Sequence, residues 1–86
     1  MKNGLIIDPI GDKFWYLHGK YHREDGPAIE NANGDKYWYL DGKYHREDGP
    51  AIEYANGNKF WYLNDQKIYC KNNQEFLHMM KLKAFL

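Results

Sequence analysis

Short runs of aromatic and apolar residues, separated by turn-forming residues, follow one another along most of the chain. Residues 36–40 read KYWYL and residues 50–54 read PAIEY, and both runs are rich in strand-forming side chains. The Asn-Gly pairs at 33–34 and 56–57 favour the positive φ angles of tight hairpin turns. The pattern therefore predicts an antiparallel β-meander. The predicted strands are 5–7, 13–17, 27–31, 36–40, 50–54, 59–63 and 67–70.

The apolar residues in the last part of the chain have a different spacing. From Gln74 onward the apolar residues fall at helical spacing, and Asn72 followed by Glu75 is a plausible capping box. We expect residues 72–86 to form an amphipathic helix that covers the last strand, because an exposed strand edge needs such a cover. Its apolar positions are Phe76, Leu77, Met79, Met80, Leu82 and Phe85.

The chain contains a tandem repeat. Residues 12–34 read DKFWYLHGKYHREDGPAIENANG and residues 35–57 read DKYWYLDGKYHREDGPAIEYANG, so the two copies differ at only three positions over 23 residues. A third copy begins at Asn58 and decays over 58–71, and residues 3–11 resemble a degenerate second half of a copy. We therefore expect one repeat domain over residues 1–86, with atypical terminal units and 72–86 as its helical cap.

The stretch WYLDGKYHREDGPAIEYANG resembles the MORN repeat family, in which an aromatic strand, a Gly-Lys turn, a His after the Lys and a second strand ending in Ala-Asn-Gly follow one another. Where the common form has Gly-x-Gly, this chain has Arg-Glu-Asp, as in repeats from bacterial, phage and giant-virus open reading frames. The resemblance implies a mainly β fold, an antiparallel β-meander of MORN-like β-hairpin repeats with a C-terminal α-helical cap. It also implies a non-enzymatic scaffold. The matching positions in the second copy are Trp38, Gly42, Lys43, His45, Gly49, Ala55 and Gly57.

Charge and composition narrow the function classes. Twelve basic side chains balance twelve acidic ones, so the formal net charge is zero and binding to nucleic acid or to an anionic membrane is not expected. Cys70 is the only cysteine, which excludes an intrachain disulfide. The apolar run 5–7 is too short for a signal-peptide core, and no run is long enough to span a bilayer. We expect a cytoplasmic protein, in the host cytoplasm if phage-encoded, without membrane insertion.

The duplicated HRED segments are the first place to look for chemistry. His22, Arg23 and Glu24 in one copy correspond to His45, Arg46 and Glu47 in the next. The structural interpretation is that each Arg pairs with a Glu or Asp of its own or the next repeat. Identical groups repeated about 10 Å apart argue against catalysis, which needs inequivalent groups, and against a tetrahedral metal site. We expect no enzyme activity, no metal and no cofactor.

Aromatic side chains occupy both faces of each predicted strand of the WYL type. Trp38 and Leu40 alternate with Tyr37 and Tyr39, and the first face of all three copies is expected to form the core. The tyrosines would form a partly exposed cross-strand ladder, and such a patch is typical of a partner surface. Because one sheet of this size cannot bury both faces, an isologous homodimer through the aromatic surface is also expected.

The sequence thus predicts a protein-interaction module, for instance a phage- or bacterium-encoded inhibitor that binds a host defence protein. The alternative is small-ligand binding through inter-repeat aromatics, either of choline or glucan or by sequestering a nucleotide. The predicted partner-binding residues are Tyr16, Tyr37, Tyr39, Tyr62, His22, Arg23, Glu24, His45, Arg46 and Glu47.

Overall fold

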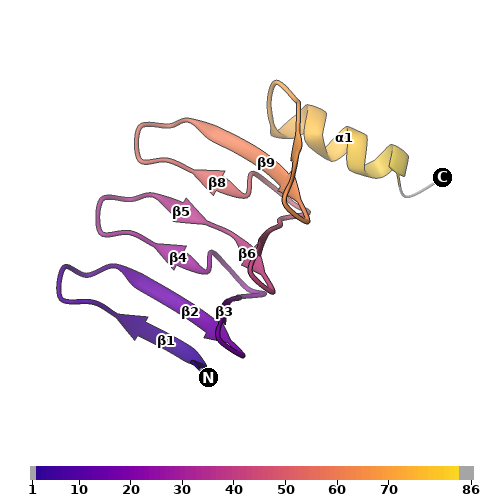
Figure 1. Ribbon diagram of the computed structural model, residues 1–86. Helices are drawn as coiled ribbons and strands as arrows, with labels where there is room; N and C mark the ends of the chain where they lie inside the picture. The colour runs from indigo at the N-terminus through magenta and orange to yellow at the C-terminus, as the bar shows by residue number, and fades with distance from the viewer. Residues whose placement is uncertain (1, 84–86) are drawn as a thin grey trace.

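The computed structural model describes residues 2–83, which form ten strands and one helix. Figure 1 shows the strands lying side by side in one elongated array, with β1 at one end and the helix at the other. The mainly β, antiparallel fold with a C-terminal helix is confirmed. The elements are β1 Gly4–Ile7, β2 Lys13–Leu17, β3 Lys20–Tyr21, β4 Ile29–Glu30, β5 Lys36–Tyr37, β6 Tyr39–Leu40, β7 Lys43–Tyr44, β8 Ile52–Glu53, β9 Lys59–Leu63, β10 Gln66–Ile68 and α1 Asn73–Lys83.

Every strand pair is antiparallel, and the main sheet has the order β1-β2-β4-β5-β8-β9-β10, with β3 paired to the end of β2. The strands β6 and β7 form a separate pair. The predicted strands 13–17 and 59–63 are found with the same bounds. The predicted strands 27–31 and 50–54 are shorter in the structure.

The predicted strand 36–40 is interrupted at Trp38, where the backbone changes its partner. The Trp38 amide donates to the Ala51 carbonyl (2.7 Å), whereas the Trp38 carbonyl accepts from the His45 amide (3.1 Å). Trp15 makes the same exchange one copy earlier, with the Ala28 carbonyl and the His22 amide. On this side of the strand, Trp15 and Trp38 are therefore the points at which one backbone partner replaces another.

The second half of each aromatic strand enters a two-residue turn. His18 and Asp41 have φ angles of 53° and 51°, and the glycines after them also have positive φ. Two consecutive positive φ angles are typical of the type I′ turn, which joins β2 to β3 and β6 to β7. The sequence analysis missed β3 and β7 because each has only two residues.

The predicted Asn-Gly turns at the opposite ends of the strands are confirmed. Gly34 and Gly57 have φ angles of 103° and 93°, and each amide donates to the carbonyl three residues earlier (both 2.9 Å). Carboxylates join neighbouring turns, because Asp12 Oδ1 accepts from the Ala32 amide and Asp35 Oδ1 accepts from the Ala55 amide, both at 2.7 Å. The spacing between turns is therefore held by side chains as well as by the sheet.

Little of the molecule is fully buried. The face expected to form the core consists of Trp15, Leu17, Trp38, Leu40, Trp61 and Leu63. Only Trp61 is buried and the other five are half-buried, so that expectation is wrong for most of the set. The reason is that a single sheet has no second layer, and only Trp61 lies against the helix. The buried apolar residues among those described are Ala28, Ala51, Ile52, Trp61 and Phe76.

The helix α1 covers the last aromatic strand. Asn72 Oδ1 accepts from the Glu75 amide (2.9 Å), which confirms the predicted cap, although the Glu75 carboxylate reaches the Lys71 amide (3.2 Å). The Phe76 ring packs against Trp61 with centroids 6.4 Å apart, and Phe76 is fully buried. The predicted helix 72–86 extends beyond the described residues at 84–86, which include Phe85.

We predict that Gly57→Val lowers the free energy of unfolding by more than about 1 kcal/mol, because valine is strained at positive φ. The site is otherwise open, since a Cβ atom there would meet nothing within 4 Å. Thermal or urea unfolding measures the change. Gly57→Asn is the control, because asparagine tolerates this conformation and should cost less. Equal stability of Gly57→Val and the wild type would contradict the turn geometry.

Candidate functional site

Arg46 lies flat on the ring of Trp38. Its guanidinium carbon is 3.9 Å from the ring centroid, and the side chain is only 22% exposed. Its Nε donates to Asp48 (2.9 Å), and its Nη1 donates to the Pro50 carbonyl (3.1 Å) and to Glu53 (2.8 Å). The arginine is thus a cover for the tryptophan, and its charge is neutralised by carboxylates of its own repeat.

Arg23 repeats this arrangement in the first copy. It lies 3.9 Å from the Trp15 centroid and donates to Asp25 (3.0 Å), the Pro27 carbonyl (3.1 Å) and Glu30 (2.9 Å). The sequence left open whether each arginine pairs with a carboxylate of its own repeat or of the next one. The structure shows the pairing within the same repeat. The predicted site residues Arg23 and Arg46 therefore hold the loops onto the sheet.

The glycine of each HREDGP loop makes room for the guanidinium. A Cβ atom on Gly49 would lie 2.7 Å from the Arg46 Cζ atom, and one on Gly26 would lie 3.0 Å from the Arg23 Cζ atom. Neither guanidinium group can easily move away, because several hydrogen bonds hold it. Each loop therefore requires glycine for space and not for a special φ.

The histidines join one copy to the next. His22 Nδ1 accepts from the Asp41 amide (2.9 Å), while its Nε2 lies 3.3 Å from the Glu24 carboxylate. The Asp41 carboxylate also lies 3.4 Å from Nδ1, so both nitrogens of the ring have a partner. The second copy has the same contacts, at 3.1 Å each, with His45, Asn64 and Glu47. These histidines bridge repeats, a role that the sequence analysis did not foresee.

The tyrosines lie on the opposite face of the sheet from Trp38, as the alternation predicted. Tyr16, Tyr39 and Tyr62 are not direct neighbours, however, since Tyr21 and Tyr44 lie between them. The successive ring centroids from Tyr16 to Tyr62 are 5.0, 5.3, 4.4 and 5.1 Å apart. We call these five rings the tyrosine ladder. The Gly-Lys-Tyr motif in the sequence indicates the two additional tyrosines, because a two-residue turn places the tyrosine after it opposite the tyrosine on the preceding strand.

Two tyrosines of the ladder, Tyr21 and Tyr39, have raised pKa values. Burial and hydrogen bonding with Tyr44 raise the pKa of Tyr39 far above its ordinary value of 10.0. Hydrogen bonding with Tyr16, followed by burial, raises the pKa of Tyr21. In Tyr37, which lies edge-on to Tyr54 (6.0 Å), burial raises the pKa. The neutral phenols are therefore stabilised by folding.

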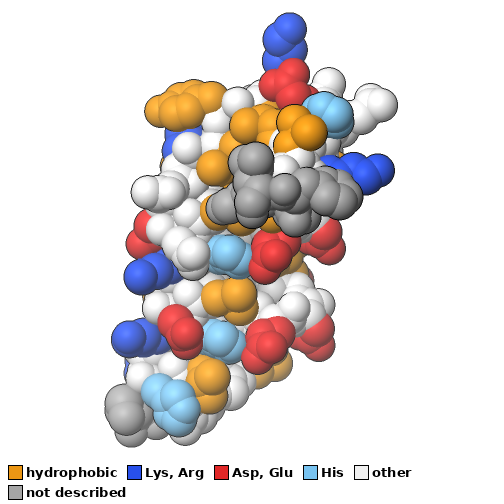
Figure 2. All heavy atoms as spheres, turned by 90° about the vertical axis from the view of Figure 1, so that its right-hand side faces the viewer, with side chains coloured by type: hydrophobic (Ala, Val, Ile, Leu, Met, Phe, Trp, Pro, Cys, Tyr) orange, Lys and Arg blue, Asp and Glu red, His pale blue; other side chains and the backbone are white. Residues whose placement is uncertain are grey.

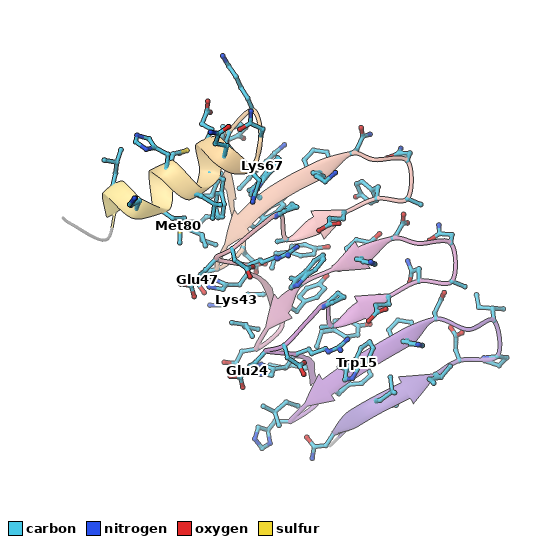
Figure 3. The ribbon with its side chains drawn as sticks, turned by 180° about the vertical axis from the view of Figure 1, so that it is seen from behind. Trp15, Glu24, Lys43, Glu47, Lys67 and Met80 are labelled. Carbon is cyan, nitrogen blue, oxygen red and sulfur yellow. The ribbon has the colours of Figure 1, made fainter. Side chains whose placement is uncertain are left out.

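A groove of about 630 Å³ separates the two HREDGP loops. Trp38 and Leu40 lie in it, Arg23 to Pro27 line one wall, and His45 to Asp48 line the other. In Figure 3, Glu24 and Glu47 lie one above the other along the same edge of the molecule. Figure 2, which faces this edge, shows acidic side chains gathered there with histidines beside them.

The rim of this groove is acidic. Its four carboxylates are 70–87% exposed, whereas both arginines are mostly covered and paired. The groove brings together Arg23, Glu24, His45, Arg46 and Glu47, but His22 is not in its lining and the predicted tyrosines are on the other face. The predicted set therefore falls on two surfaces. The groove residues that were not among the predicted site residues are Asp25, Gly26, Pro27, Trp38, Leu40 and Asp48.

Other candidate chemistry is sparse in residues 2–83. No group of three or more His, Cys, Asp or Glu side chains among them could hold a metal ion. Burial, with a smaller contribution from Glu75, raises the pKa of the Cys70 thiol, which opposes a reactive thiolate. In the same part of the chain, no helix combines the length and apolarity needed to cross a membrane.

Comparisons with known proteins return no match: none of the protein-family models, curated proteins or solved structures searched matches this chain. The interpretation of the site therefore depends on its geometry.

We predict that Arg46→Lys lowers the free energy of unfolding by about 2 kcal/mol, because lysine keeps the charge but loses the planar stack and the second donor position. Urea unfolding followed by tryptophan fluorescence measures the loss. Lys43→Arg, a change of similar size at an exposed position, is the control. An Arg46→Lys variant as stable as the wild type would show that the stack contributes nothing.

We predict that the protein loses stability as the pH rises above 10.0, where unfolded tyrosines ionise. Since folding raises the pKa of Tyr39, the burial of its neutral phenol contributes its full stabilisation below that pH. This contribution disappears as the pH rises towards the pKa of Tyr39 in the folded protein. Urea unfolding at a series of alkaline pH values measures the decline. Tyr39→Phe should flatten it, and Tyr69→Phe, which changes an 80% exposed residue outside the ladder, is the control. Identical slopes for the wild type and Tyr39→Phe would refute this role.

Proposed function

We propose that this chain is a non-enzymatic protein-interaction module built from MORN-like tandem repeats, and that it binds its partner in the groove between the two HREDGP loops. The observation that carries the proposal is the combination of fixed walls, an apolar floor and an exposed acidic rim in one groove of about 630 Å³. Binding surfaces commonly surround an apolar centre with polar groups in this way.

The bonds around the groove support binding over catalysis. Both arginines are held by their own repeat, and both histidines are held between a backbone amide and a carboxylate. A catalytic acid or base must be free to exchange a proton with a substrate, and these groups are engaged in holding the fold. The two copies also present equivalent groups, whereas general acid–base catalysis needs groups with separated pKa values.

The charge of the rim favours a cationic segment of the partner. Glu24 and Glu47 contact only histidine in the described structure, and Asp25 and Asp48 each share one oxygen with an arginine. A lysine or arginine side chain could place its aliphatic part over Leu40 and its charge among these carboxylates. Each exposed ion pair contributes little to the binding free energy, so we expect the carboxylates to act mainly on the association rate and on selectivity.

The repeated sequence supports the repeat assignment, since the turn and loop contacts recur 23 positions apart. An inhibitor of a host defence protein, encoded by a phage or a bacterium, is one setting in which a small module of this kind would act.

We predict that the tagged protein captures a specific protein from a lysate of the organism that encodes it, and that Glu24→Gln/Glu47→Gln weakens capture at least about tenfold because two rim charges are lost. Mass spectrometry identifies the partner, and calorimetry with the purified partner measures the affinity at two salt concentrations. Glu75→Gln is the matched control, because it removes one carboxylate charge at the helix start, away from the groove.

Three outcomes would contradict this function. The partner could bind the groove variant as tightly as the wild type. A hydrolase and transferase screen could find a turnover that is lost in an Arg46 variant. Calorimetry with choline and a nucleotide panel could detect sub-millimolar binding, which would favour the alternative of small-ligand binding.

A further inference from the structure

The strand β1 is an apolar edge at the end of the sheet opposite the helix (Figure 1). Leu5, Ile6 and Ile7 are 48%, 39% and 56% exposed. Exposed edges are usually blunted by a charged side chain, a proline or a bulge, and Gly4–Ile7 contains none of these. The other end of the sheet differs, because β10 carries Lys67 and the chain then continues into the helix.

The hydrogen bonds of the neighbouring residues determine which backbone groups of β1 are free. Trp15 directs its amide to the Ala28 carbonyl and its carbonyl to the His22 amide, so both groups point away from β1. Leu5 is the residue opposite Trp15, and in an antiparallel ladder such a pair exchanges no bonds. The Asp8 amide donates to the Asp12 carbonyl (3.0 Å). The backbone groups of the even-numbered residues of this segment therefore point towards β2. The N–H and C=O groups of Leu5 and Ile7 therefore point outward from the sheet.

The side chains on this edge favour the addition of another apolar strand. Leu5 lies beside Trp15 on one face, and Ile6 lies beside Phe14 on the other. Both faces of the edge are thus apolar, and a strand added here would extend an existing aromatic surface on each side. The tyrosine ladder is a weaker candidate for this contact, because its rings already stack on one another.

We propose that β1 pairs antiparallel with β1 of a second copy, around a two-fold axis at Ile6. Leu5 of each copy then faces Ile7 of the other, and these two pairs exchange four backbone hydrogen bonds. A second copy fits because the edge is self-complementary and the net charge of zero adds no overall repulsion. The assembly closes at two copies, because the two-fold contact uses the β1 edge of both molecules. This dimer is independent of the proposed function and leaves the groove open.

Light scattering coupled to gel filtration should give twice the 10.3 kDa monomer mass at high concentration and the monomer mass on dilution. Amide hydrogen exchange measured by NMR tests the register. In the concentrated sample the Leu5 and Ile7 amides should exchange at least about tenfold more slowly than in the dilute one, while the inward Ile6 amide is protected in both. A monomer throughout would overturn the proposal. So would a dimer whose Leu5 and Ile7 amides stay unprotected, since the contact would then lie elsewhere.

Ile7→Lys places a charge on the paired edge and should abolish dimerisation while circular dichroism stays that of the folded protein. Ile10→Lys is the control, because Ile10 is 73% exposed in the turn beyond β1 and should leave the dimer intact. An Ile7→Lys variant that still dimerises would refute the edge contact. If this variant unfolds, the exchange pattern of the wild type still decides.

Discussion

The stack of each HREDGP arginine on a tryptophan is the interaction on which the rest of this structure depends. Apart from the large sheet, the only sheet that residues 2–83 form is the two-stranded pair of β6 and β7, and Trp15 and Trp38 stay half-buried. The guanidinium group of Arg46 supplies a cover at Trp38, and carboxylates and a carbonyl of the same repeat hold it there. A loop of charged residues thus performs the role of a second layer.

The third copy shows how this requirement is met when the arginine is missing. At Trp61 the helix replaces the loop, with the Phe76 ring against the indole and Asn73 Oδ1 accepting from the indole N–H (3.0 Å). The replacement buries Trp61 more completely than the guanidinium buries Trp38, because a phenyl ring on a helix excludes water on a wider area. The helix therefore covers the last tryptophan, while β1 keeps an exposed apolar edge.

The same stack determines what the surface can offer a partner. Because both arginines are neutralised within their repeats, the carboxylates that project furthest dominate the groove. The histidines hold successive repeats at a fixed spacing. The groove walls are therefore fixed by hydrogen bonds between repeats as well as by those within each repeat. Rigidity of this kind lowers the entropy cost of binding, which matters for a small module with little buried core.

Local patterns in the sequence were sufficient for the strands 13–17 and 59–63, the Asn-Gly turns and the Asn72 cap, since each depends on residues within a few positions of one another. Tertiary structure alone decided that the arginines cover the tryptophans, that the histidines bond to the next repeat, and that Tyr21 and Tyr44 complete the ladder. Those contacts join residues up to 19 positions apart, or depend on a loop folding back over its sheet. Periodicity assigns a residue to a face, but it does not specify what covers that face. The loop covers it here because the glycines leave room for a guanidinium group whose hydrogen-bond partners are already in place.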